Sequence, residues 1–207
     1  MLELLELLEL QTPLFGPVSL TLTRGECVGI AGPSGAGKSS LLRAIADLDP
    51  HAGTARLDGR DMTSFTPAQW RRRVQLLPAD PEWWLARVGD HFPRRLVEAA
   101  RRLQLPDGVW DWPPERLSSG ERQRLALLRA LAREPDVLLL DEPTANLDAD
   151  NVAGAETLIR ESREARQVCV IWVSHDRGQL TRVADRRFIL RGGRLVAETE
   201  QACSSSR

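Results

Sequence analysis

Apolar and polar residues along the chain predict short strands that alternate with helices. Alternation over Val18–Thr23 and the apolar run at Glu26–Ala31 predict two strands, the second one buried, and helical spacing follows over Ser39–Leu48. Later elements are expected as the strands Thr54–Leu57 and Val74–Leu77, the helices Phe92–Leu105 and Ser119–Ala132, the strand Val137–Leu140, the helix Asn151–Arg163, the strand Val168–Val173 and the hairpin Phe188–Val196. This order predicts an α/β fold with a largely parallel sheet covered by helices.

The two ends of the chain and one internal segment depart from this pattern. Residues Leu2–Leu10 repeat leucine and glutamate with a period of three, and we expect them to form an edge strand. The segment Asp80–Pro114 holds four of the six tryptophans among several prolines, which indicates a subdomain with its own surface. We therefore expect one domain over residues 1–200, with a helical subdomain at about 80–133 inserted in its core, and a frayed tail over 201–207.

Composition narrows the class of protein. The chain has 207 residues, of which 42% are hydrophobic, so it can bury a core of its own. Its formal net charge is −1, which argues against a nucleic-acid partner. The longest apolar runs have the length of strands, and Met1 is followed by Leu-Glu repeats, so we expect neither a membrane-spanning helix nor a secretory signal. The widely spaced Cys27, Cys169 and Cys203 fit reduced thiols in a cytoplasm.

The strongest chemical signal lies between the strand Glu26–Ala31 and the helix after it. The residues that match G-x-x-x-x-G-K-[ST], with the one that follows, are Gly32, Pro33, Ser34, Gly35, Ala36, Gly37, Lys38, Ser39 and Ser40. Lys38 is the only lysine in the chain, and its compact charge on a flexible stem can reach between β- and γ-phosphates, where a planar guanidinium would fit badly. Backbone N–H groups would bind the phosphates of ATP, and the Ser39 hydroxyl would bind Mg²⁺.

Two acidic residues add the chemistry of hydrolysis. Asp141 and Glu142 follow the apolar strand Val137–Leu140, so we expect them at the carboxyl edge of the sheet, where ligands of open α/β folds bind. Asp141 would hold Mg²⁺ through water, and Glu142 would orient or deprotonate the attacking water. Two acidic residues after a strand also occur in solvated loops, but together with the phosphate-binding loop they predict an ATPase.

The segment Leu117–Arg124 indicates which kind of P-loop protein this is. It reads Leu-Ser-Ser-Gly-Glu-Arg-Gln-Arg, and by itself it is also a capping box formed by Ser118 and Glu121. It resembles the signature of the ATP-binding cassette (ABC) family, Leu-Ser-Gly-Gly-Gln, which also lies shortly before the acidic strand. The resemblance extends over about Val18–Val196. It implies a P-loop NTPase fold of the ABC type, with a small antiparallel β region and a short helical subdomain.

Similarity to that family implies roles for further residues. Two cassettes of the family bind ATP head to tail, so Ser118 and Gly120 would contact the nucleotide held by a second copy of this chain. The segment ending in Asp148 resembles the D-loop of the family, which links the two sites across the dimer. His175 directly follows a strand, as the switch histidine of the family does, and would hydrogen-bond the γ-phosphate and the attacking water.

The resemblance also implies partners and a location. The chain would be the cytoplasmic ATPase subunit of a transporter, held at the inner face of the cell membrane by a separate integral membrane permease, with ATP and Mg²⁺ as cofactors and no nucleic acid. The compact helical region and the segment Trp172–Asp176 are similar to ATPase subunits of the bacterial iron-export type, which implies export of a metal ion. Two alternatives stay open: a soluble ABC ATPase that acts on nucleic acid or the ribosome, and a small-molecule P-loop kinase.

Three features depart from the family pattern. In the signature, Ser119 replaces the first glycine and Glu121 replaces the glutamine. Ala79 stands where the family has a glutamine that contacts Mg²⁺ and water, with Asp80 one residue later, so we expect hydrolysis to persist but to be slow. The chain has no tyrosine, and Phe15 lies too close to the P-loop to match the adenine-stacking aromatic of the family, so the residue that contacts the base stays unassigned.

Overall fold

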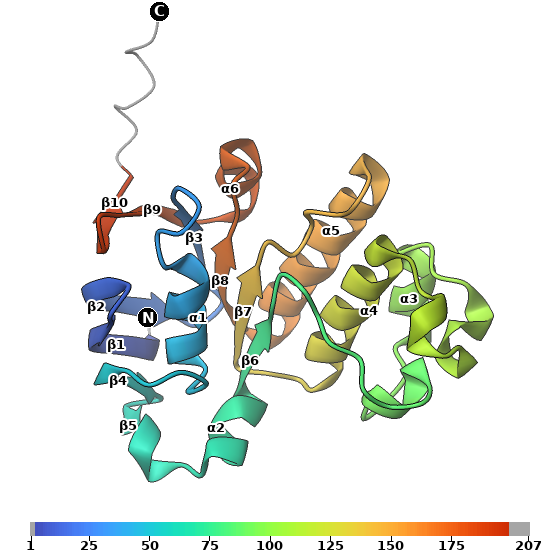
Figure 1. Cartoon of the computed structure of the whole chain (residues 1–207), viewed down its shortest axis with the longest axis horizontal. Helices are drawn as coiled ribbons and strands as arrows, with labels where there is room; N and C mark the ends of the chain where they lie inside the picture. The colour runs from blue at the N-terminus through green and yellow to red at the C-terminus, as the bar shows by residue number, and fades with distance from the viewer. Residues whose placement is uncertain (1–2, 199–207) are drawn as a thin grey trace, which may run out of the picture.

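The computed structural model describes residues 3–198, which form two β-sheets and six α-helices (Figure 1). The strands are β1 (Glu3–Thr12), β2 (Phe15–Thr23), β3 (Cys27–Ala31), β4 (Ala52–Leu57), β5 (Arg60–Asp61), β6 (Val74–Leu77), β7 (Val137–Asp141), β8 (Cys169–Val173), β9 (Arg186–Arg191) and β10 (Arg194–Ala197). One sheet is antiparallel with the order β2-β1-β4-β5, and the other has the order β10-β9-β3-β8-β7-β6. In the second sheet only β10 runs antiparallel to its neighbour.

Helices cover both faces of the six-stranded sheet. They are α1 (Lys38–Ile45), α2 (Pro67–Arg73), α3 (Val97–Arg102), α4 (Ser119–Ala132), α5 (Ala149–Arg166) and α6 (Arg177–Val183), with 3₁₀ turns at Met62–Ser64, Val88–His91, Asp107–Asp111 and Pro114–Arg116. Helix α1 lies between the two sheets, and α4 and α5 lie on the opposite side of the six-stranded sheet, with α3 beyond them (Figure 1).

Each face of the six-stranded sheet packs into its own apolar cluster. Leu139 and Ile171 pack with α1 and the antiparallel sheet, whereas Leu138 and Trp172, one residue away in each strand, pack with α4 and α5. Successive side chains of a strand point to opposite faces, so β7 and β8 are buried on both sides. This explains their unbroken apolar sequences and confirms the predicted α/β class.

The first strand is confirmed as a strand, but its predicted place at the edge of a sheet is wrong. β1 pairs with β2 on one side and with β4 on the other. Its register shifts between Leu7 and Leu10, and Glu9 between them has a φ of 51°. A β-bulge inserts one extra residue into a strand, so Leu7 and Leu10 both reach the core although they are three residues apart. The bulge therefore explains the spacing of three between Leu7 and Leu10.

The helical subdomain contains fewer helical residues than the sequence predicts. The expected helix Phe92–Leu105 is restricted to the six residues of α3, Val97–Arg102. Pro93 and Pro106 account for the loss of Phe92 and Leu105, because a proline disfavours helical backbone in the residue before it. The later start at Val97 has no such local cause. Trp110 is buried in this region, whereas Trp84 is 67% exposed.

Helix α2 was not expected from the sequence. It begins at Pro67, and the Thr66 hydroxyl accepts a hydrogen bond from the N–H group of Gln69 at its start, which completes a capping box. Trp70 fixes the helix to the core: its side chain is 1% exposed, and its Nε1 donates to the carbonyl oxygen of Ile45 at 2.9 Å. Only one turn of apolar spacing marks this helix, so periodicity does not reveal it.

The buried thiols fit the expectation of reduced cysteines. Cys27 and Cys169 are both buried and free, and burial raises the pKa of each to about 12. Cys203 and the tail expected over 201–207 lie outside the described residues. None of the helices within residues 3–198 is long and apolar enough to cross a membrane.

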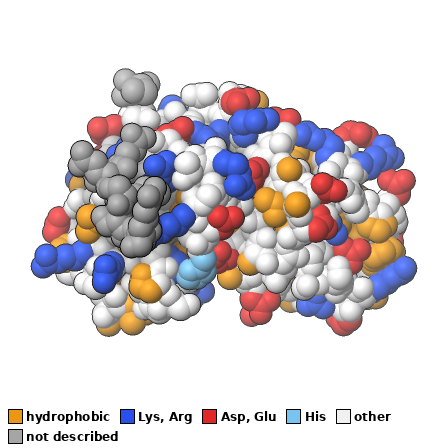
Figure 2. Space-filling view, turned by 90° about the horizontal axis from the view of Figure 1, so that it is seen from above, with side chains coloured by type: hydrophobic (Ala, Val, Ile, Leu, Met, Phe, Trp, Pro, Cys, Tyr) orange, Lys and Arg blue, Asp and Glu red, His pale blue; other side chains and the backbone are white. Residues whose placement is uncertain are grey.

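Charged side chains of both signs cover the surface. On the face seen in Figure 2, basic and acidic side chains are interspersed. Many of them form exposed ion pairs, such as the bidentate contact of Arg102 with Glu161 at 2.7 and 2.8 Å. Exposed pairs of this kind stabilise a fold by about 0–1 kcal/mol each. The fold therefore depends mainly on its two apolar clusters.

Candidate active site

The P-loop connects β3 to α1 and bends sharply at glycines. Gly37 has a φ of 96°, in the left-handed region that side chains disfavour. Gly32 is required for another reason, because a Cβ atom there would lie 2.4 Å from the carbonyl oxygen of Leu190. The loop is therefore held against β9, and its end joins the first turn of α1.

Lys38 folds over the loop at the start of α1. Its Nζ donates to the carbonyl oxygens of Gly32 and Pro33 at 2.8 and 3.0 Å, and the residue is only 7% exposed. Burial lowers the pKa of Lys38, while the nearby carboxylates of Glu142 and Asp141 raise it. An ammonium group held in this way can exchange two carbonyl partners for phosphate oxygens without a change in the backbone.

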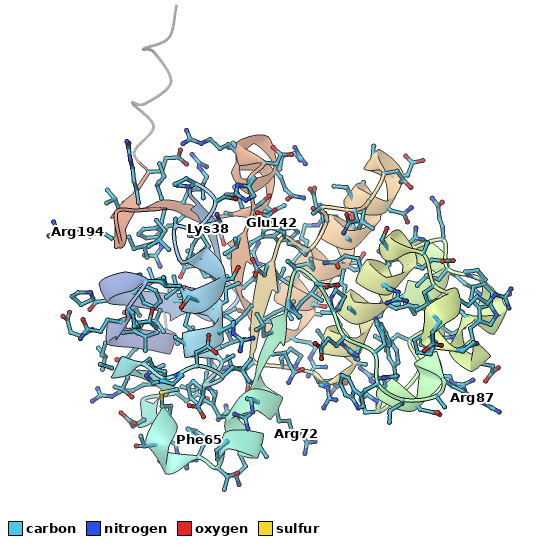
Figure 3. All side chains as sticks on the ribbon, viewed as in Figure 1. Lys38, Phe65, Arg72, Arg87, Glu142 and Arg194 are labelled. Carbon is cyan, nitrogen blue, oxygen red and sulfur yellow. The ribbon has the colours of Figure 1, made fainter. Side chains whose placement is uncertain are left out.

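One pocket of about 260 Å³ joins the P-loop to the residues at the ends of β7 and β8. Its lining residues are Leu14, Ser34, Gly35, Ala36, Gly37, Lys38, Ser39, Ser40, Ala79, Asp141, Glu142 and His175. Figure 3 shows Lys38 and Glu142 at the same edge of the sheet. Seven of the nine P-loop residues named from the sequence therefore share a pocket with both acidic residues and the histidine.

Glu142 and His175 face each other across this pocket. The N–H group of Glu142 donates to the carbonyl oxygen of Val173 at 3.0 Å, and its φ of 48° turns the side chain out of the strand direction. Glu142 Oε1 lies 3.4 Å from His175 Nε2 and has no hydrogen bond from the described residues. Burial raises the pKa of Glu142, against the opposing effects of His175 and Lys38. Such a carboxylate is suited to accept a proton or to orient a water molecule.

The oxygens of Ser39 and Asp141 fit a magnesium site. Both residues line the pocket beside Lys38, and Asp141, the last residue of β7, is 7% exposed. Hydroxyl and carboxylate oxygens together with phosphate oxygens are the ligands that Mg²⁺ prefers. Magnesium bound there would neutralise charge on the phosphates.

Ser118, Gly120 and Asp148 do not line this pocket. Ser118 and Glu121 form a reciprocal capping box at the start of α4. The capping box predicted for this segment is therefore confirmed. Asp148 caps α5 and accepts hydrogen bonds from Asn151. A Cβ atom on Gly120 would lie 3.1 Å from the carbonyl oxygen of Asn146, so the two segments touch.

Comparison with known proteins identifies the family. A family model described as "ABC transporter" matches residues 15–145, more than half of the chain. This chain belongs to the ABC transporter family. It is 38% identical over 187 residues to an aliphatic sulfonates import ATP-binding protein of Frankia alni, an alignment that covers 88% of this chain and 73% of that protein.

Further relatives agree with this family. The chain is 38% identical over 193 residues to an Fe(3+) ions import ATP-binding protein of Rhodococcus jostii, which covers 86% of this chain and 56% of that protein. Protein STAR1 of Oryza sativa is 37% identical over 192 residues with the same coverage, so the chain spans little more than half the length of these two relatives. A solved ATP-binding subunit of an ABC transporter has the same fold, with a TM-score of 0.85 at 24% identity over 95% of this chain and 90% of that one.

The described residues also locate the positions that depart from the ABC pattern. Ala79 lines the pocket, whereas Asp80 does not. Gln75 points elsewhere, because its Nε2 donates to the carbonyl oxygen of Arg71. No amide side chain enters the pocket among its described lining residues.

The exposed apolar side chain beside the P-loop is that of Leu14, which is aliphatic. Phe15 is buried in the core of the antiparallel sheet, so it cannot stack on a base. Leu14, its neighbour, is 61% exposed and lines the pocket. A Cβ atom on Gly37 would lie 3.3 Å from the carbonyl oxygen of Leu14, so the turn between β1 and β2 rests on the P-loop.

Sequence reasoning missed four buried or half-buried residues near the site. They are Gln123, Thr144, Glu156 and Gln179. The amide of Gln179 contacts Thr144, 35 residues away, and Glu156, 23 residues away. No local pattern predicts such contacts. The one available signal was the short separation in sequence, since Gln179 lies four residues after His175.

Proposed function

We propose that this chain is the ATP-hydrolysing subunit of an ABC transporter and that residues 1–200 act as one ATPase domain. The observation that carries the proposal is the single pocket that combines Lys38 and the P-loop with Asp141, Glu142 and His175. ATP-binding subunits of the ABC family are ATPases. A kinase of the P-loop class would not need the signature segment that begins α4.

The roles of the side chains follow from their positions. Lys38 and the N–H groups of the P-loop would bind the β- and γ-phosphates. The Glu142 carboxylate would orient the attacking water and accept its proton, and His175 Nε2, 3.4 Å from that carboxylate, would donate to the γ-phosphate. Ser39 and Asp141 would hold Mg²⁺. With Ala79 in place of an amide, one contact to water is lost, and we propose slow turnover.

The active form would be a head-to-tail dimer of this chain. Ser118 and Gly120 lie at the N-terminus of α4, whose free N–H groups favour an anion. They do not line the pocket of their own chain, so a second copy is the natural source of the phosphate that they would contact. Asp148 would lie at the same interface, because its segment touches Gly120.

A groove between α2 and α4 would bind the permease. Four arginines line it, Arg71, Arg72, Arg129 and Arg133, and no acidic side chain is found among its described lining residues. The exposed ring of Trp84 forms its apolar wall. We propose that it receives an acidic segment of the permease that carries an apolar residue, because the charges would then be complementary.

Arg129 is the central cation of this groove. It stacks over Trp83, with 4.4 Å between its Cζ and the ring centroid, and donates to the carbonyl oxygen of Glu82 at 3.0 Å. Burial and the neighbouring Arg133 lower its pKa to about 10. A carboxylate of the permease would relieve this destabilisation of the charged form, and the chain would thus be held at the membrane.

The transport direction that we propose is import. The iron-export type of cassette implied export of a metal ion, but the relatives from Frankia alni and Rhodococcus jostii are named as import proteins and match most of this chain. The cargo would be selected by the permease, so neither sulfonate nor iron is assigned to this chain.

The adenine base would lie over Leu14. This side chain is the large apolar one among the described residues that line the pocket. An aliphatic surface gives apolar contact without aromatic stacking. We therefore propose weak discrimination among nucleoside triphosphates.

Steady-state ATP hydrolysis tests the proposed site. Wild type should hydrolyse ATP, while Glu142→Gln should not and should form an ATP-dependent dimer, as measured by size in the same samples. Lys38→Ala is the matched control, which should neither bind ATP nor dimerise. Hydrolysis at the wild-type rate by either variant would refute the assignment.

A further inference from the structure

We propose that Gln179 is a positioning residue that sets the distance between Glu142 and His175. Gln179 lies in the first turn of α6 and is 2% exposed. It is not one of the residues that line the pocket, and it lies outside the P-loop. Its side chain nevertheless contacts both loops that carry the proposed catalytic pair, and the inference rests on the function proposed for that pair.

The amide of Gln179 bridges the two loops. Its Nε2 donates to Thr144 Oγ1 at 2.9 Å, two residues after Glu142 in the chain. Its Oε1 accepts from Ser174 Oγ at 3.1 Å, the residue before His175. Ser174 Oγ also accepts from the N–H group of Asp176 at 3.1 Å, on the other side of His175. One buried amide therefore holds the segments that follow β7 and β8.

A third contact fixes the orientation of the amide. Gln179 Nε2 donates to Glu156 Oε1 of α5 at 3.0 Å, and Glu156 also accepts from Arg182 at 2.9 Å. A carboxylate can only accept, so it decides which end of the amide faces α5 and leaves Oε1 for the Ser174 hydroxyl. Every polar atom of the Gln179 side chain thus has a partner.

The polarity of this network makes its role testable. In Gln179→Glu, two carboxylates face each other at the distance of a hydrogen bond, and this repulsion should move one loop. In Glu156→Gln, an amide oxygen can still accept from Gln179. In the double variant Gln179→Glu with Glu156→Gln, the amide and the carboxylate exchange places: the new carboxylate can accept from Thr144, Ser174 and the new amide.

The first measurement is the ATP hydrolysis of these variants. Gln179→Glu should lower kcat by about 10- to 100-fold, because a shift of about 1 Å in a catalytic group has effects of this size. The KM for ATP should stay within about twofold, since Lys38 and the N–H groups of the P-loop, which would make most of the phosphate contacts, are not touched. Glu156→Gln should resemble wild type, and the double variant should recover most of the lost kcat. Thr181→Val, which removes a local hydrogen bond on the same helix, is the matched control and should be unchanged.

The second measurement is a readout that does not need turnover. The chain has three histidines, so the imidazole resonances of His175 can be separated by NMR from those of His51 and His91. Gln179→Glu and Gln179→Met should both shift the His175 resonances and leave the other two in place. A purely structural role would lower thermal stability without this selective shift.

The outcomes separate this inference from the proposed function. Wild-type kcat and unshifted His175 resonances in both Gln179 variants would overturn the inference, and so would a double variant no better than Gln179→Glu. In either case the function would stand as long as Glu142→Gln abolishes hydrolysis. If Glu142→Gln hydrolyses ATP at the wild-type rate, the function itself fails, and with it the positioning role.

Discussion

Replacement of Leu14 by tyrosine tests whether an aliphatic side chain limits nucleotide binding. Leu14 is 61% exposed at the rim of the pocket, and the turn that carries it rests on Gly37 of the P-loop. Gly37 is one of the residues that would surround the phosphates, so a base attached to them can reach this turn. Because Leu14 is largely solvent-exposed, a larger side chain there displaces no core atoms, and Leu14→Tyr should fold as wild type does.

The expected gain follows from the difference between two contacts. Stacking of a base on an aromatic side chain is worth about 1–3 kcal/mol. Partial burial of the leucine under a base already supplies about 1 kcal/mol, since full burial of such a side chain is worth about 1.5–3 kcal/mol. The net gain of about 1 kcal/mol corresponds to roughly fivefold tighter ATP binding.

Competition with a fluorescent ATP analogue measures this gain. The assay should use the Glu142→Gln background, so that hydrolysis does not deplete the nucleotide. Leu14→Tyr should tighten binding of ATP, GTP, CTP and UTP, with the purines gaining most, and Leu14→Ala should weaken all four. Unchanged dissociation constants in both Leu14 variants, alongside lost binding in Lys38→Ala, would show that the base does not lie over this turn.

Four further predictions concern catalysis, stability and the partner. As pH is lowered, turnover should begin to fall above pH 4.5, the ordinary pKa of a glutamate, because the pKa of Glu142 is raised. The protonated carboxyl group cannot accept a proton from water, and a pH–rate profile measures this loss. A raised pKa in the folded state also means that the free energy of unfolding of wild type falls as pH rises through that pKa. In urea denaturation, Glu142→Gln should therefore be more stable than wild type near pH 7 and equal to it below pH 4.5. Trp70→Ala should cost about 3–5 kcal/mol in the same assay, because it removes a fully buried ring and the hydrogen bond to Ile45. Arg129→Gln should weaken co-purification with the permease by more than about tenfold without lowering basal hydrolysis, and equal recovery of the permease would contradict the proposed groove.

The sequence predicts best what depends on neighbouring residues in the chain. The P-loop, the acidic pair after β7 and the capping box at Ser118 were all found because covalent spacing decides their geometry. The unbroken apolar sequences of β7 and β8 likewise reveal strands buried on both faces.

Features that depend on distant residues could not be predicted in the same way. The bulge at Glu9 can be seen only once β1 has partners on both sides, so an interior strand resembled an irregular edge strand. The helix expected from Phe92 begins only at Val97, four residues after a proline that could have opened it, so its start is not set by local sequence. Gln179 acquires its role from Thr144 and Glu156, which only the fold brings within reach.

The solitary lysine turns the nucleotide pocket into a site that chemistry can address selectively. Lys38 is the only side-chain amine in the chain, and its lowered pKa leaves more of it in the nucleophilic, neutral form than an exposed lysine would have. An amine-directed reagent therefore has one side chain to modify, and bound ATP should shield it. The labelling of the peptide that contains Lys38, which proteolysis separates from any label on the α-amino group, would report the fraction of occupied pockets without a mutation or an attached fluorophore.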